Sequence, residues 1–126
     1  MKVVIDDKIP FIRGILEPFA ELVYLPGGEI RREHLMDAEC LIIRTRTRCN
    51  SQLLEGTSVR FIATATIGFD HIDTGWCEKN GIRWINAPGC NAESVAQYVT
   101  SALAVLSGRH HFKLKDKTLG IIGLGQ

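Results

Sequence analysis

The sequence predicts an α/β fold in which a doubly wound parallel sheet carries helices on both of its faces. Three observations lead to this prediction. Five short apolar segments alternate with segments of helical pattern, and the connections between them are short. In addition, 45% of the 126 residues are hydrophobic, which is enough to fill the core of one domain.

The predicted strands are short, rich in β-branched residues and bounded by turn residues. Right-handed crossovers between parallel strands favour a flavodoxin-like strand order. The five strands are predicted over residues 3–5, 21–25, 40–43, 61–65 and 82–85.

The predicted helices are marked by capping residues at their starts and by proline or glycine at their ends. Asp70 is expected to cap the helix before the fifth strand, and Gly56 and Gly81 are expected to end two of the helices. Four helices are predicted between the strands, over residues 10–18, 31–36, 50–54 and 70–80.

The longest predicted helix follows the fifth strand. Asn91 is expected to cap it, and it runs to about Ser107 with Gly108 as its stop. Its alanines and valines recur at i, i+3, i+4 and i+7, so another backbone can approach one face closely. We expect residues 1–90 to form the first domain, residues 91–108 the helix, and residues 117–126 the start of a second domain.

The overall composition excludes several classes of protein. A formal net charge of +1 is too low for a strongly basic nucleic-acid-binding protein. No apolar run approaches the roughly 18 residues of a membrane-spanning helix. We therefore expect neither nucleic acid nor a membrane as a partner. The four cysteines are widely spaced and form no CxxC pair, which argues against a metal site and is typical of reduced thiols in the cytoplasm.

The last residues of the chain carry the first candidate site. An apolar strand predicted over residues 119–122 leads into Gly123, Leu124 and Gly125. In a dinucleotide-binding fold, the first of two such glycines makes a tight turn and the second lets the backbone approach the pyrophosphate. Gly123, Gly125 and Gln126 are therefore candidate cofactor-binding residues, although turns use glycine for many reasons. Natural domains rarely end in such a turn, so we interpret the chain as a fragment.

The loop after the third strand carries the second candidate site. Arg44, Arg46 and Arg48 alternate there with Thr45 and Thr47. Ligands of parallel α/β sheets bind outside the carboxyl ends of the strands, where this loop begins. Guanidinium groups, hydroxyls and loop amides suit a phosphate or a carboxylate. The alternative is an ordinary solvated loop.

The loop after the fourth strand carries the third candidate site. Gly68 allows a ligand to approach the backbone closely, Thr66 offers a hydroxyl, and successive amides offer donors for an anion. Asp70 is interpreted as a helix cap rather than as a catalytic acid, and His71 is interpreted as structural.

Three segments of the chain, in this order, resemble the D-isomer-specific 2-hydroxyacid dehydrogenases. They are ATIGFDHID at residues 65–73, NAESVAQ at 91–97 and LGIIGLG at 119–125. The resemblance covers the whole chain. Within the family, residues 4–10, 44–50, 64–66 and 87–92 favour a member that acts on a small phosphorylated 2-hydroxy acid.

The resemblance implies that the chain is the substrate-binding part of an NAD-dependent oxidoreductase. The family has an NAD-binding Rossmann domain, which residues 117–126 would begin. NAD would be the cofactor of the longer enzyme, and we do not expect it to bind this fragment. The family's catalytic arginine, glutamate and histidine lie outside this chain, so we expect no catalytic residue here and no activity from the fragment alone. The implied substrate-binding residues are Thr45 and Thr66 at the substrate, Arg44 and Arg46 at its phosphate, and the Ile67 and Gly68 amides at its carboxylate.

The long helix resembles the family's interdomain helix, which also builds a dimer contact. We therefore expect a homodimer, or a disordered tail after about Gly108. Two alternatives stay open. The chain can belong to a family member that acts on phosphoglycerate or glyoxylate, or it can be a non-enzymatic module for anion binding or dimerisation.

Overall fold

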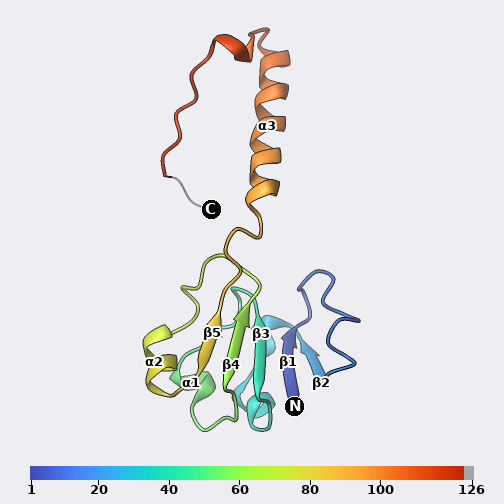
Figure 1. Ribbon diagram of the computed structural model, residues 1–126, viewed down its shortest axis with the longest axis vertical. Helices are drawn as coiled ribbons and strands as arrows, with labels where there is room; N and C mark the ends of the chain where they lie inside the picture. Colours follow the sequence, from blue (N-terminus) through green and yellow to red (C-terminus); the bar gives the residue numbers. More distant parts are fainter. Residues whose placement is uncertain (124–126) are drawn as a thin grey trace. The chain divides into compact units, whose positions relative to one another are not determined.

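The computed structural model describes residues 1–123, and its strands form one parallel sheet in the order β2-β1-β3-β4-β5 (Figure 1). This is the flavodoxin-like order that the sequence predicts. The strands are β1 (Lys2–Asp6), β2 (Glu21–Leu25), β3 (Cys40–Ile43), β4 (Phe61–Thr64) and β5 (Arg83–Ile85). The helices are η1 (Gly27–Glu29), η2 (Arg32–Leu35) and η3 (Leu114–Asp116), which are 3₁₀ helices, and α1 (Ser51–Leu54), α2 (Thr74–Lys79) and α3 (Ala92–Arg109).

The main hydrophobic cluster lies on one face of the sheet, and β1 is buried on both faces. In β3 and β4 the residues alternate between buried and half-buried, and Leu41, Ile43 and Ile62 have no exposed surface. Leu35 from η2 and Leu54 from α1 pack into the same cluster. A parallel sheet that is covered on both faces has continuously buried strands. The alternation therefore shows that the second face of β3 and β4 is only partly covered.

The strand register brings several loops to the same edge of the sheet. Asp6 at the end of β1 pairs with Leu25 at the end of β2, and Ile43 at the end of β3 pairs with Thr64 at the end of β4. The Ala65 N–H continues this pairing by donating to the Ile43 carbonyl at 2.9 Å. The loops after these four strands therefore leave the sheet side by side, which positions the candidate site.

The helix predicted for residues 10–18 does not form. Residues 7–20 make turns and bends instead. Phe11 has a φ of 59°, a left-handed value that an α-helix does not contain, and the ring of Pro18 removes an N–H donor. The prediction was wrong because Pro10 suits a first helical turn, and that local signal says nothing about the backbone of the residue that follows it.

The cap assignments are correct at one helix and wrong at another. The Asn50 side chain accepts from the Leu53 N–H and begins α1, as predicted. Asp70, by contrast, does not cap α2. That helix starts at Thr74, and its cap is Asp73, whose Oδ1 accepts from the Trp76 N–H at 3.0 Å. Residues 70–72 are unavailable for the helix because they lie beside Cys49, to which Ile72 forms a bridge.

The C-terminal part differs from its prediction in three places. Asn91 directly precedes α3, but its side chain makes no capping hydrogen bond. Helix α3 continues through Gly108 to Arg109, and His111, with a φ of 53°, takes the left-handed position expected near the glycine. The strand predicted over residues 119–122 is absent, because the described residues hold no neighbouring strand to bond with it.

Contacts divide the chain into one compact unit of Met1–Ala87 and a second that starts at Pro88. The second unit contains α3, none of whose residues is buried. Among the described residues, no helix is both long and apolar enough to cross a membrane.

Replacing Asp73 with alanine is expected to lower the free energy of unfolding by roughly 0.5–2 kcal/mol, because the Trp76 N–H loses its acceptor. The matched variant Asp70→Ala removes an exposed carboxylate that caps nothing and is expected to change it by less than about 0.5 kcal/mol. Urea unfolding of both variants at pH 8 makes the comparison. Equal losses would show that Asp73 has no special role at the start of α2.

Candidate functional site

The loop after β3 is held in place at two points. Thr47 is buried, and its hydroxyl donates to the Gly27 carbonyl at 2.8 Å. Two residues later, the Cys49 N–H donates to the His71 carbonyl at 2.8 Å, and the Cys49 carbonyl accepts from the Asp73 N–H at 2.8 Å. The loop is therefore joined to the segment after β2 on one side and to the segment after β4 on the other.

Just before these anchors, the loop presents Thr45 and Arg46 to solvent, while Arg44 is half-buried. Thr45 and Arg46 take part in a cavity of about 590 Å³ at the ends of β1, β2 and β3. The strand order reverses between β1 and β3, and this reversal is where doubly wound sheets bind ligands. The cavity is lined by Asp6, Lys8, Pro26, Gly27, Gly28, Glu29, Arg44, Thr45 and Arg46.

The wall of this smaller cavity is tightly built around Asp6. The Asp6 carboxylate is 2% exposed, and its Oδ1 accepts from the Lys8 N–H at 2.9 Å. The Lys8 carbonyl in turn accepts from the Arg44 Nη1 at 2.9 Å, which fixes that guanidinium at the cavity. A Cβ on Gly27 would lie 2.5 Å from Asp6 Oδ2, so only glycine fits there without displacing the carboxylate.

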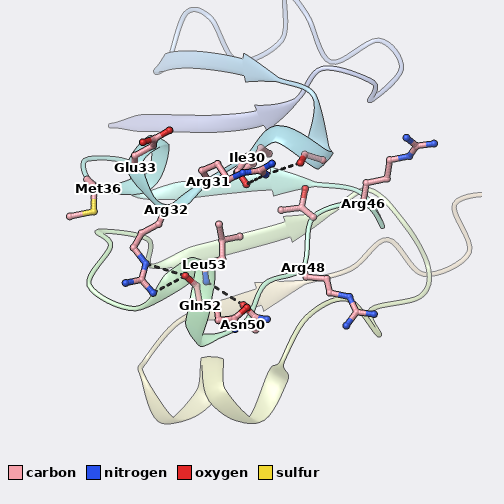
Figure 2. Close-up of a pocket in the computed structure, with 12 residues that line it drawn as sticks. Ile30, Arg31, Arg32, Glu33, Met36, Arg46, Arg48, Asn50, Gln52 and Leu53 are labelled. Atoms are coloured by element: carbon pink, nitrogen blue, oxygen red, sulfur yellow. Dashed lines mark hydrogen bonds between the residues drawn. The ribbon is translucent and has the colours of Figure 1, made fainter.

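A second, larger cavity of about 930 Å³ lies on the other side of the β3 loop (Figure 2). Figure 2 shows Arg46 and Arg48 extending from this loop, with Arg32 reaching toward α1. Only Gly28 and Arg46 line both cavities. The larger cavity is lined by Gly28, Ile30, Arg31, Arg32, Glu33, Met36, Arg46, Thr47, Arg48, Asn50, Gln52 and Leu53.

The loop after β4 contains a chain of hydrogen bonds. The Thr66 hydroxyl donates to the Gly68 carbonyl at 2.9 Å and lies 2.7 Å from the Thr64 hydroxyl, which lies 2.9 Å from His71 Nε2. Each hydroxyl has one proton to donate. Because Thr66 uses its proton on Gly68, Thr64 must donate to Thr66, and His71 must donate to Thr64. The network therefore assigns the Nε2–H tautomer to His71.

This network also determines what the Thr66 hydroxyl can still do. One lone pair of its oxygen remains, which can accept a hydrogen bond from a ligand hydroxyl but can donate nothing to a carboxylate. The Ile67 and Gly68 N–H groups donate no hydrogen bond among the described residues and are available to an anion. The Ile67 carbonyl is held by the Asn86 side-chain amide at 2.8 Å.

The protonation of His71 is affected by its surroundings. Partial burial lowers the pKa of His71 below its usual 6.5, and the nearby Asp70 carboxylate offsets part of this effect. The neutral ring is therefore favoured, in agreement with the hydrogen-bond network. The sequence interpretation of His71 as a structural residue fits this position, since its Nε2 is already used within the protein.

The structure brings some of the predicted site residues together and leaves others apart. Arg44, Thr45 and Arg46 line one cavity, and the register places Thr45 and Thr66 at equivalent positions, two residues after the paired Ile43 and Thr64. Gly123 has a φ of +88°, which suits a tight turn. The other two candidate cofactor-binding residues, Gly125 and Gln126, lie outside the described residues.

Sequence reasoning missed Asp6, Lys8 and Gly27 in the smaller cavity, and Arg31 and Arg32 in the larger one. In the sequence, Asp6 stands out only as part of the segment 4–10 that carries the family resemblance, and Gly27 stands in an ordinary Pro-Gly-Gly turn. Their location beside the β3 loop depends on the strand order, which no local pattern shows. Within residues 1–123, no group of three or more histidine, cysteine or acidic side chains could hold a metal ion.

Comparison with known proteins identifies relatives over the whole chain. A family model described as D-isomer specific 2-hydroxyacid dehydrogenase, catalytic domain, matches residues 7–113. The erythronate-4-phosphate dehydrogenase of Bacteroides fragilis is 56% identical over 126 residues, which cover 99% of this chain and 36% of the relative. That of Hahella chejuensis is 46% identical, with 100% of this chain and 33% of the relative covered. The chain thus spans about a third of the length of these relatives.

Solved structures share the fold. NAD+-bound 3-phosphoglycerate dehydrogenase of Entamoeba histolytica matches with a TM-score of 0.66 and 28% identity, covering 80% of this chain and 37% of that one. The apo form of Escherichia coli D-lactate dehydrogenase matches with a TM-score of 0.69 and 20% identity, covering 88% and 38%. The second match is a likeness of fold alone.

The pKa of His71 gives a testable pH dependence. Between the lowered pKa of the folded state and 6.5, the unfolded chain binds more protons than the folded one, so the free energy of unfolding falls as the pH drops through this window. We expect His71→Gln to lose this part of the pH dependence. Urea unfolding of both proteins at pH 5 to 8 measures the difference.

Nitrogen-15 NMR of the His71 ring checks the same assignment directly. The expected result is a pKa below 6.5 and, above it, the chemical shifts of the Nε2–H tautomer. A pKa at or above 6.5, or the Nδ1–H tautomer, would contradict the hydrogen-bond network.

Proposed function

This chain belongs to the D-isomer specific 2-hydroxyacid dehydrogenase family, and from that premise we propose that it forms the substrate-binding part of an NAD-dependent erythronate-4-phosphate dehydrogenase. The observation that carries the proposal is its 56% identity to such an enzyme over 126 residues. The cationic cavity at the end of β1 and β3 supports it, because the substrate named by the relatives carries a phosphate.

The proposed reaction oxidises 4-phospho-D-erythronate to the 2-oxo acid, as a step of pyridoxal 5'-phosphate biosynthesis. The hydride from C2 goes to NAD, and the proton of the 2-hydroxyl leaves to a base. The residues that carry out this chemistry in the family lie outside this chain. The part played by the described residues is to bind and orient the substrate, which contributes to rate by positioning.

The two candidate loops would bind different groups of the substrate. After β3, Arg44 and Arg46 offer charge-assisted donors to the 4-phosphate, and Thr45 lies at the same level as Thr66 in the next loop. After β4, the free N–H groups of Ile67 and Gly68 suit the carboxylate. Thr66 accepts from a hydroxyl of the substrate, and its bond to Gly68 fixes the loop.

The proposal makes NAD the cofactor of the longer enzyme. The described residues supply only Gly123 of the glycines that a pyrophosphate site needs, so residues 1–123 do not make up a dinucleotide site. We also propose a cytoplasmic location, because the four cysteines are free thiols, as is typical of a reducing compartment.

We further propose that the chain forms a homodimer through α3. Val95, Val99 and Leu106 of this helix are 53%, 40% and 44% exposed, and Tyr98 is 75% exposed. An amphipathic helix with no buried residue gains stability when its apolar face is covered. A second copy of the same helix offers a face of matching chemistry.

Calorimetric titration of this chain with 4-phospho-D-erythronate tests the proposed function, with 3-phosphoglycerate, glyoxylate, inorganic phosphate and NAD as comparisons. We expect 4-phospho-D-erythronate to bind most tightly and NAD not to bind. Thr45→Val is expected to weaken binding roughly two- to tenfold through the loss of one hydrogen bond. Thr100→Val removes an exposed hydroxyl of α3 and is expected to change nothing.

The ranking of the ligands decides between the alternatives. Tighter binding of 3-phosphoglycerate or glyoxylate would assign the chain to another member of the family. Binding of inorganic phosphate with the same affinity as the acids would favour a plain anion-binding module.

Light scattering tests the homodimer. The expected result is twice the 14.0 kDa mass of the chain, and reduction to one copy when Val99 and Leu106 are both replaced by aspartate. A monomer at high micromolar concentration would rule out association through α3.

A further inference from the structure

The larger cavity beside the β3 loop has more positive than negative side chains among the described residues that line it. Four arginines line it, and its one carboxylate, Glu33, is 79% exposed and lies 3.7 Å from His34 Nε2. Among the described residues, the ion pairs involve lysine, histidine or the N-terminus, and none involves an arginine. Four guanidinium groups against one carboxylate leave the lining of this cavity with an excess of positive charge, which favours an anion as ligand.

Two of these arginines are held in place by neutral groups. Arg31 Nη1 donates to the Gly28 carbonyl at 2.7 Å. Arg32 donates through Nε and Nη2 to the Gln52 carbonyl, at 3.0 and 2.7 Å (Figure 2). Carbonyl acceptors fix a guanidinium without cancelling its charge, and each of these side chains keeps unused N–H donors. Their positions are therefore set before any ligand arrives, which reduces the entropy lost on binding.

The opposite wall is also rich in donors. Arg46 and Arg48 make no hydrogen bond among the described residues, and buried Thr47 fixes the backbone between them. Asn50 uses its Oδ1 to accept from the Leu53 N–H, which leaves its side-chain N–H₂ unpaired. Guanidinium and amide donors suit a ligand group that only accepts hydrogen bonds and carries more than one negative charge.

We propose that this larger cavity is a binding site for a polyanionic phosphoryl group, such as the diphosphate of a small molecule, and that it is separate from the substrate site. Arg31, Arg32 and Arg48 line the larger cavity alone, whereas Asp6, Arg44 and Thr45 line the smaller cavity alone. A volume of about 930 Å³ accommodates a phosphorylated small molecule and not only a bare phosphate. The inference does not depend on the proposed substrate.

The probe is inorganic pyrophosphate, titrated into the nitrogen-15-labelled chain at constant ionic strength maintained with sodium chloride. The side-chain Nε–Hε signals of Arg31, Arg46 and Arg48 are expected to shift together and to saturate. By calorimetry, Arg48→Gln and Arg31→Gln are each expected to weaken pyrophosphate binding roughly ten- to hundredfold, as the loss of one charge-assisted bond implies.

Two variants act as controls. Arg60→Gln removes the same charge just before β4, at the other end of the sheet, and is expected to leave the pyrophosphate affinity within about twofold. Arg44→Gln is expected to weaken 4-phospho-D-erythronate binding and to spare pyrophosphate. Arg44 lines only the smaller cavity, and Arg48 lines only the larger one. Failure of the proposed function and failure of this inference therefore give different results.

Three results would overturn the proposal. Shifts that rise without saturating, or equal losses in Arg48→Gln and Arg60→Gln, would show only screening of a basic surface. Pyrophosphate effects confined to Arg44 and Thr45 would place the anion in the substrate cavity. Circular dichroism of Arg48→Gln and Arg31→Gln checks that each variant is folded, and the wild-type NMR titration decides the matter without either of them.

Discussion

The hydrogen bond from the buried Thr47 hydroxyl to the Gly27 carbonyl is the contact on which the rest of the site depends. It joins the loop after β3 to the segment after β2, and these two segments enclose both cavities. Breaking it would leave a buried hydroxyl and a carbonyl without partners, which is more costly than the bond is favourable. The bond therefore fixes the backbone at Thr47, from which Arg46 and Arg48 extend on either side along the chain.

A second set of interactions gives the neighbouring loop its shape. His71, Thr64 and Thr66 pass hydrogen bonds in one direction to the Gly68 carbonyl. The direction follows from proton counting. The Ile67 and Gly68 N–H groups of the same loop donate to no acceptor among the described residues. In both loops, threonine hydroxyls bond within the protein and hold the backbone in place. The Arg46 side chain and the Ile67 and Gly68 N–H groups remain available to a ligand. This is how a binding site is organised before its ligand arrives.

The sequence predicts the sheet correctly because its signals are local and repeated. Each strand is a short apolar run, and the crossover rule leaves few possible orders, so the flavodoxin-like order is confirmed. The sequence prediction fails where one local signal fits two different structures. Asp70 and Asp73 both precede a helix, and only the pairing of Ile72 with Cys49 decides which one caps it. Pro10 suits a helix start, yet the left-handed Phe11 prevents the helix.

For the candidate site, the sequence identified the residues that stand in one continuous motif. Arg44, Thr45 and Arg46 were found because they follow a strand directly. Asp6, Arg31 and Arg32 were missed because they reach the site from other segments, and only the order of the strands brings them there.

Arg46 lines both cavities, so the two proposed anion sites would be linked thermodynamically through one side chain. An anion held on either side draws on the same guanidinium, so each ligand weakens the binding of the other. Linkage requires that the two effects be equal in size, whichever ligand arrives first. A single side chain at the boundary would then let the concentration of one phosphorylated metabolite adjust the occupancy of another, with no change of backbone conformation.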